Sequence, residues 1–150
     1  MGSRVPEVID RLVQLGEADT GLKDVRIADG PEVTADADMD WLIVGFDGDP
    51  NGDFQAAQSV GGWSDLRTGR DEQFRITVAA ISQRGDTDVR AARARAYEIA
   101  ARVEAWTRTD PTLGLRSLEA GVEATQLTQD QTQQGVQAVL LLTVAGSAFT

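Results

Sequence analysis

The 150-residue sequence contains no histidine and no cysteine, and its only lysine is Lys23. Without cysteine the chain cannot form disulfides, thiolate zinc sites or iron–sulfur clusters, and it has no thiol nucleophile. Without histidine it lacks the side chain that most often serves as a general base near pH 7 and as a transition-metal ligand. These absences exclude most hydrolase and metalloenzyme designs. We therefore expect a protein that is not an enzyme and uses no cofactor.

Long hydrophobic segments are also missing. The longest aliphatic run, Ala138 to Leu142, is far shorter than the roughly 20 residues that cross a membrane. The first eleven residues lack the apolar core of a signal peptide. The sequence therefore predicts neither membrane insertion nor export.

Negative charge dominates the composition and gathers in one segment. The chain has 24 acidic and 14 basic residues, a net charge of −10, which argues against a surface that coats DNA or RNA. No basic residue occurs between Arg26 and Arg67. The acidic residues in that interval are Asp29, Glu32, Asp36, Asp38, Asp40, Asp47, Asp49, Asp53 and Asp65. No motif assigns a role to the acidic stretch 32–53.

Two segments show the periodicity of amphipathic helices. Residues 5–15 place apolar side chains on one stripe and precede Gly16, a typical helix terminator. A longer helix, predicted to begin at a Thr87 N-cap and to end at Asp110-Pro111, has apolar residues at steps of three and four. Its stripe consists of Val89, Ala92, Ala96, Ile99, Val103 and Trp106.

Several short segments have the alternation or the apolar runs of β-strands. They cover residues 24–28, 41–46, 54–60, 73–83, 117–125 and 136–146. Within 54–60, Phe54, Ala56 and Val60 are expected to share a face, and the uncharged segment 136–146 predicts a central strand. The polar stretches 47–53 and 128–135 predict mobile loops. The order of elements predicts one α+β domain over residues 1–150, with a single mostly antiparallel β-sheet and two α-helices packed on it.

Two acidic clusters suggest cation binding, although neither is complete. Residues 47–53 place Asp47, Asp49 and Asn51 at positions 1, 3 and 5 of an EF-hand-type calcium loop and Gly52 at position 6. Position 12 is Gln58, where such a loop needs glutamate, so the alternative is a polar turn between strands. Asp36, Asp38 and Asp40 alternate in the same way, and a solvated loop is again the alternative to a divalent-cation site. We expect no metal site.

Basic residues of the long helix lie away from its apolar stripe. They are Arg90, Arg93, Arg95 and Arg102. A solvated face is one interpretation, and a surface that meets an acidic neighbouring subunit is the other. The candidate subunit-interface residues are these arginines together with Asp47, Asp49 and Asp53.

Several local motifs combine into a resemblance that runs from about Val5 to Ala145. The helix start Gly85-Asp86-Thr87-Asp88 and the helix exit Asp110-Pro111-Thr112-Leu113-Gly114 are the most specific of them. The strand ending in Asp29-Gly30-Pro31 and a final hairpin with a Gln-rich tip before Gly135 agree with the same pattern. In this combination the chain resembles the tail terminator, or tail completion (tail-to-head joining), proteins of long-tailed bacteriophages.

The resemblance implies a structural virion protein without chemistry. Such proteins form a homo-oligomeric ring, usually a hexamer, that caps the tail tube, ends its polymerisation and presents the surface joined by the head–tail connector or neck protein. DNA passes through the ring without specific binding, and the protein belongs to the virion tail or neck after assembly in the host cytoplasm. Alternatives are another small neck, head-completion or minor tail component, or a calcium-dependent binding module using Asp47–Asp53.

Overall fold

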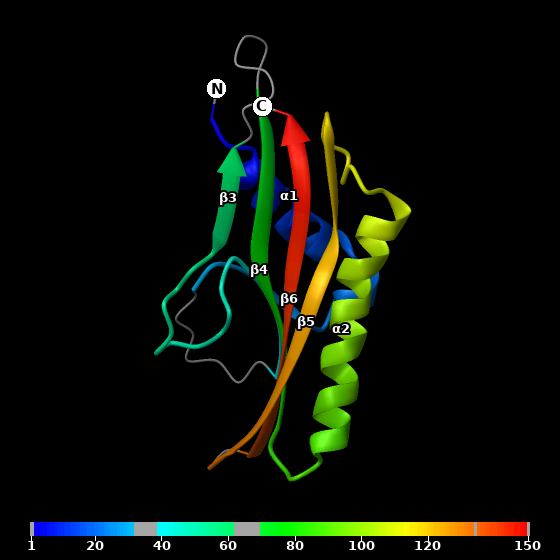
Figure 1. Ribbon diagram of the computed structural model, residues 1–150. Coiled ribbons are helices and arrows are strands. Elements are labelled where there is room, and N and C mark those ends of the chain that lie inside the picture. The colour runs from blue at the N-terminus through cyan, green and yellow to red at the C-terminus, as the bar shows by residue number, and fades with distance from the viewer. Residues whose placement is uncertain (1, 32–38, 62–69, 134, 150) are drawn as a thin grey trace.

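The computed structural model describes residues 2–31, 39–61, 70–133 and 135–149, and these form an α+β fold (Figure 1). Two α-helices, α1 and α2, a 3-10 turn, η1, and six strands follow one another along the chain. Their bounds are α1 Val5–Ala18, η1 Thr20–Leu22, β1 Arg26–Asp29, β2 Asp40–Val44, β3 Ala57–Gly61, β4 Asp71–Arg84, α2 Val89–Thr109, β5 Leu118–Thr132 and β6 Gly135–Phe149. The predicted fold class and the order of its elements are confirmed.

The six strands form one mostly antiparallel sheet. Its order is β1-β2-β4-β6-β5, with β3 paired separately to β4. Only the pairing of β1 with β2 is parallel among the described strands. The uncharged strand β6 lies between β4 and β5, so the prediction that residues 136–146 form a central strand is confirmed.

β2 and β3 share one edge of β4. Val44 pairs with Val78 at the end of β2, and Ala57 pairs with Ile76 at the start of β3. Thr77 lies between these two rows. Its carbonyl oxygen accepts a hydrogen bond from Gly45 N–H, and its N–H donates one to Ala56 O. Residues 45–56, called here the β2–β3 loop, therefore leave the sheet and return to it at neighbouring positions along β4.

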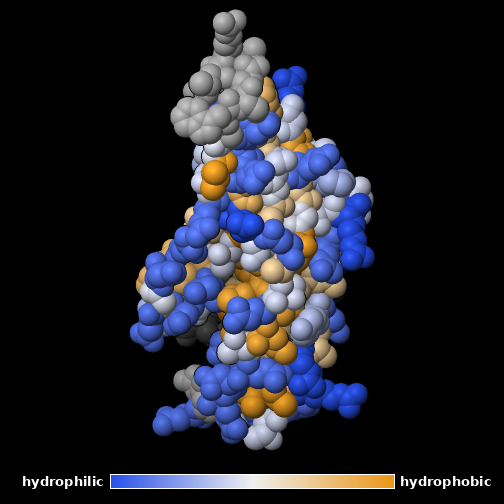
Figure 2. Space-filling model, viewed as in Figure 1, coloured by the Kyte–Doolittle hydropathy of each residue, from blue (hydrophilic) through white to orange (hydrophobic). Residues whose placement is uncertain are grey.

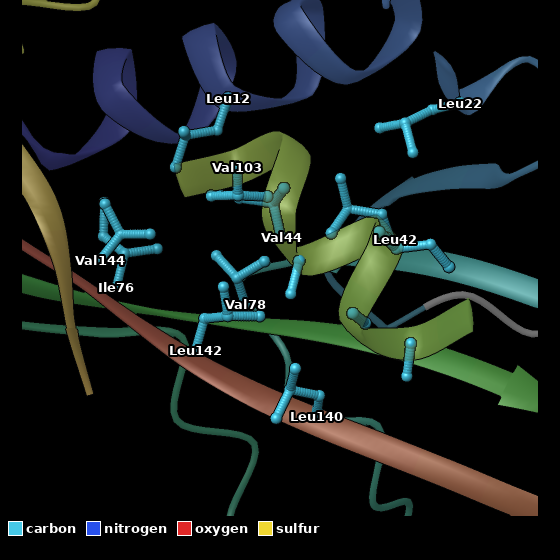
Figure 3. Close-up of a cluster of buried hydrophobic side chains, with 14 of the residues drawn as sticks. Leu12, Leu22, Leu42, Val44, Ile76, Val78, Val103, Leu140, Leu142 and Val144 are labelled. Carbon is cyan, nitrogen blue, oxygen red and sulfur yellow. The ribbon is translucent and has the colours of Figure 1, made fainter. Parts of the chain in front are cut away.

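Both helices cover the same face of the sheet. Alternate residues of β4, among them Ile76 and Val78, are buried beneath Leu12 of α1 and Val103 of α2 (Figure 3). The predicted apolar stripe of α2 is confirmed: its alanines, Ile99 and Val103 are buried, and its two terminal members are partly buried. Because the alanines of α2 are small, the helix backbone lies close to the strands, and the space that side chains must fill between helix and sheet is narrow.

A smaller apolar cluster lies on the helix-free face, beneath the β2–β3 loop. Phe46 packs there with Ile43 and Ile81, and its ring stacks on Phe54 with 5.3 Å between the ring centroids. Gly48 has φ +83°, and a β-carbon added to it would lie 2.9 Å from Cδ1 of Ile81, so glycine lets the loop lie directly on the strand. With this cluster on one face and the core beneath the helices on the other, residues 42–46 are buried on both sides of the sheet.

The first helix and the third strand differ from their predictions. α1 continues past Gly16 to Ala18, so this glycine does not end the helix. It is buried against β1, where a β-carbon would lie 3.1 Å from the side chain of Ile27. β3 begins only at Ala57, and Val60 is 71% exposed. Phe54 and Ala56 therefore lie in the β2–β3 loop, before the strand begins, and Val60 is the one member of the predicted face that lies in β3.

The last two strands are longer than predicted, and the expected loop 128–135 is wrong. β5 and β6 stay paired from Leu118↔Ala148 to Thr132↔Gly135, so this Gln-rich stretch is a β-ladder that closes in a tight turn. Gly135 has φ +124°, and a β-carbon there would lie 1.9 Å from Arg84 O. This stretch lacks the alternation of apolar and polar residues that marks a half-buried strand, although its threonines favour strands. Pairing with the apolar strand β6 therefore outweighs its polar pattern.

The α2 N-terminus is capped one residue later than predicted. Asp88 is the N-cap, and its Oδ1 accepts a hydrogen bond from Ala91 N–H at 3.1 Å. Asp86 Oδ1 in turn accepts from Asp88 N–H at 2.9 Å. The Gly-Asp-Thr-Asp motif is thus a capping structure.

Removing this cap should destabilise the protein. We expect Asp88→Ala to lower the free energy of unfolding by about 1 kcal/mol, because it leaves a helix N–H without its acceptor. The matched control is Thr87→Ala, one residue earlier and exposed, which should leave stability within about 0.5 kcal/mol. Urea unfolding followed by circular dichroism measures both. Equal losses for the two variants would contradict the assigned cap.

Candidate assembly surface

The four predicted interface arginines of α2 fall into two groups. Arg95 and Arg102 are bound within the chain: Arg95 Nε lies 3.4 Å from Asp40 Oδ2, and Arg102 Nε lies 2.8 Å from Asp19 Oδ2. Arg95 also pairs with Glu98, one turn along the helix, at 3.0 Å. These two side chains therefore hold the subunit together, and they are weaker candidates for a contact with another subunit.

Arg90 and Arg93 remain available to a partner. Arg90 is exposed and makes no hydrogen bond or ion pair with the part of the chain that the structure describes. Arg93 donates one hydrogen bond, from Nη1 to Gln129 Oε1 at 2.8 Å. Since a guanidinium has five N–H donors, Arg93 retains most of its capacity.

The acidic residues of the β2–β3 loop form a series of short turns. Asp47 Oδ1 accepts from Asp49 N–H at 2.8 Å, Asp49 Oδ1 from Asn51 N–H at 2.9 Å, and Asp53 Oδ1 from Gln55 N–H at 3.1 Å. These are the Asx turns that aspartate favours in loops. Among the described residues, no group of three or more acidic side chains is placed to hold a metal ion.

The carboxylate of Asp40, one member of the acidic cluster 36–40 suggested by the sequence, contacts residues of β4 and α2. Its side chain is 13% exposed, accepts from Ser82 Oγ at 2.7 Å and faces both Arg84 and Arg95. Asp36 and Asp38, the other members of that predicted cluster, lie outside the described residues. The carboxylate of Asp40 is therefore already compensated by two guanidinium groups.

Asp19 forms a buried polar contact that the sequence patterns do not reveal. Its Oδ2 accepts from Arg102 Nε at 2.8 Å and from Trp106 Nε1 at 2.9 Å, and its Oδ1 accepts from Gly21 N–H at 2.8 Å. Burial alone would raise the pKa of Asp19, but these hydrogen bonds and the arginine charge lower it below its ordinary value. This contact fastens the end of α1 to α2.

The Asp-Pro-Thr-Leu-Gly motif at the exit of α2 is also structural. Asp110 Oδ1 accepts from both the N–H and the hydroxyl of Thr112, and these bonds lower the pKa of Asp110. Leu113 is inserted into the core at φ +53°, and its carbonyl accepts from Arg11 Nε at 2.7 Å. The motif therefore ends α2 and ties it to α1.

A cleft of about 510 Å³ lies between β3 and β5, next to residues 73–75 of β4 and 145–147 of β6. Its polar lining includes Arg75, whose Nε lies 2.8 Å from Glu123 Oε2. The hydrogen bond from Arg75 lowers the pKa of Glu123 and raises that of the guanidinium. Among the residues that line the cleft, no serine hydroxyl is hydrogen-bonded to a carboxylate.

The helix-free face itself is mixed in character. In Figure 2, which views the protein from that side, separate hydrophobic patches lie over the strands among hydrophilic residues. None of the helices in the described part of the chain is long and apolar enough to span a membrane.

The fold defines the class of the protein as α+β, with two helices on one face of a mixed six-stranded sheet. No protein-family model and no curated protein matches the sequence. Among solved structures, the chain is similar to one described as "Virion of native gene transfer agent (GTA) particle", with a TM-score of 0.63 and 11% identity. That match covers 99% of this chain and 100% of the other, so the two share a fold over their whole length.

Proposed function

We propose that this protein is a structural virion component that forms a ring, most simply a hexamer, on the end of a phage-like tail tube. In this role it ends polymerisation of the tube and presents the surface that the head–tail connector or neck protein joins. The single observation that carries the proposal is the full-length match in fold to a chain of a gene transfer agent virion. Its location would be the tail or neck of the particle, after assembly in the host cytoplasm.

Composition and chemistry support the proposal. The chain has no histidine or cysteine, and its described clefts and acidic groups assemble no catalytic or metal-binding set. A net charge of −10 suits a ring through which DNA passes, since like charge keeps the polyanion from adhering to the lumen.

Deleting the gene tests the role directly. For a tail terminator, particles made without this protein should carry tubes of uncontrolled, excessive length that are not joined to heads, as seen by negative-stain electron microscopy. Supplying the protein in trans should restore uniform length. Tails of normal length that fail to join heads would instead identify a neck or head-completion protein, the first alternative.

The second alternative, a calcium-dependent module using Asp47–Asp53, predicts a different result. Calorimetry with calcium would then give stoichiometric heat that Asp49→Asn abolishes. We expect no such heat, because no acidic residue occupies position 12, where Gln58 stands, and no three acidic side chains of the described residues are placed to hold a metal ion.

A further inference from the structure

Two exposed surfaces of opposite charge lie on opposite sides of the subunit. The acidic surface is the part of the β2–β3 loop that carries Asp47, Asp49, Asp53 and Phe54, and the basic surface is the outer side of α2 that carries Arg90, Arg93, Ala94 and Tyr97. The loop and α2 lie at opposite lateral edges of the molecule in Figure 1. No ion pair joins the loop aspartates to other described residues.

Each surface combines its charge with an exposed aromatic ring. Phe54 follows Asp53 directly and is 48% exposed, although its other face stacks on Phe46. Tyr97 is 47% exposed and lies one turn from Arg93 on α2, where residues four apart share a face. Exposed aromatic rings beside charges are typical of interface centres, whereas single charges are typical of solvated surfaces.

The two surfaces lie at the same height along the strands. Gly48 in the acidic loop packs on Ile81, whose row across the sheet continues to Val139 and Thr128. Arg93 is hydrogen-bonded to Gln129, which belongs to the next row. Adjacent rows are about 3.4 Å apart along a strand. A rotation about an axis parallel to the strands would therefore bring the acidic surface of one copy level with the basic surface of the next.

We propose that this contact joins neighbouring copies: the acidic surface of one subunit binds the basic surface of the next. Asp49 and Asp53 pair with Arg90 and Arg93, and the Phe54 ring packs on Tyr97. Because the two surfaces differ, the contact is heterologous, and a rotation that returns to its starting point after a whole number of copies gives the proposed ring. This inference rests on the proposed ring and names the surfaces that build it.

The test uses two charge-reversed variants of the full-length protein, Arg90→Glu/Arg93→Glu and Asp49→Arg/Asp53→Arg. Each variant alone sets like charges against each other at every junction and should remain monomeric. An equimolar mixture places opposite charges at every junction and should assemble into rings of alternating copies. Analytical ultracentrifugation gives the masses, and negative-stain microscopy shows the rings. Rising salt should weaken assembly of the native protein, since exposed charge pairs are screened.

A matched control and the native protein separate the possible failures. Arg108→Glu/Arg116→Glu makes the same change of charge at exposed arginines outside the basic surface and should assemble as the native protein does. Native rings that persist unchanged in both reversed variants would overturn the proposed contact and leave the ring intact. Native protein without rings, alone or on tail tubes, would overturn the ring and the contact together. Recovery only in the mixture supports both.

Discussion

Replacing Gly146 with alanine should be among the most destabilising single changes in this protein. A β-carbon at Gly146 in β6 would lie 2.1 Å from Glu119 O and 2.6 Å from the ring of Phe74. The first of these atoms is backbone in the paired strand β5, so no side-chain rotation can relieve the overlap. We expect a loss of about 2–3 kcal/mol in the free energy of unfolding, as for overpacking in a well-filled core.

Gly121 in the adjacent strand provides the matched control. It occupies the same paired region, opposite Ala145, yet a β-carbon there would have nothing within 4 Å. Gly121→Ala should therefore leave stability unchanged or raise it slightly, because alanine restricts the unfolded chain. Urea denaturation of both variants measures the difference. If Gly146→Ala were as stable as Gly121→Ala, the close approach of β5 and β6 at this point would be wrong.

The second large effect is expected for Asp19→Asn. The substitution removes the negative charge that pairs with Arg102 and accepts the hydrogen bond of Trp106. The Asp19 side chain is only 6% exposed. Hydrogen bonds to charged groups contribute about 1.5–3 kcal/mol each, and Arg102 is partly solvated, so we expect a total loss of about 2–3 kcal/mol at pH 7. Asp10→Asn, at an exposed position of α1, should cause little change.

The difference between native protein and Asp19→Asn should depend on pH. The pKa of Asp19 is lowered in the folded state, so ionisation of this carboxyl favours folding. The stabilisation is fully present above the unfolded pKa of about 4. It declines as pH falls through the lowered folded-state value. A stability difference that stayed constant from pH 7 to pH 2 would show that Asp19 acts without its charge.

Local patterns predicted the elements that apolar residues specify. The stripe of α2 and the alternation of β4 both place residues such as Ile99 and Ile76 in the core, as expected. The distal half of β5 could not be predicted in this way, because its polar residues show no apolar alternation and its strand conformation depends on pairing with β6. The N-cap of α2 was predicted at Thr87, one residue before Asp88, which caps the helix in the structure.

Pairings between distant residues could not be predicted in the same way. The sequence groups Arg90, Arg93, Arg95 and Arg102 by helix and charge alone. Arg102 meets Asp19 across 83 positions of sequence, and Arg95 meets Asp40 across 55. Only the tertiary fold brings these side chains together. Reversing the charge of Arg102 would therefore harm the subunit itself, since the new carboxylate would face that of Asp19.

The long pairing of β4 with β6, from Asp71↔Phe149 to Arg84↔Val136, has a mechanical consequence. These strands extend for about 45 Å, and β5 follows β6 over nearly the same length. Tension along the strands loads all the hydrogen bonds of these ladders in shear at once, whereas tension across them opens one bond after another. In single-molecule pulling, the subunit should resist force along the strand direction far better than force that peels β5 from the edge of the sheet.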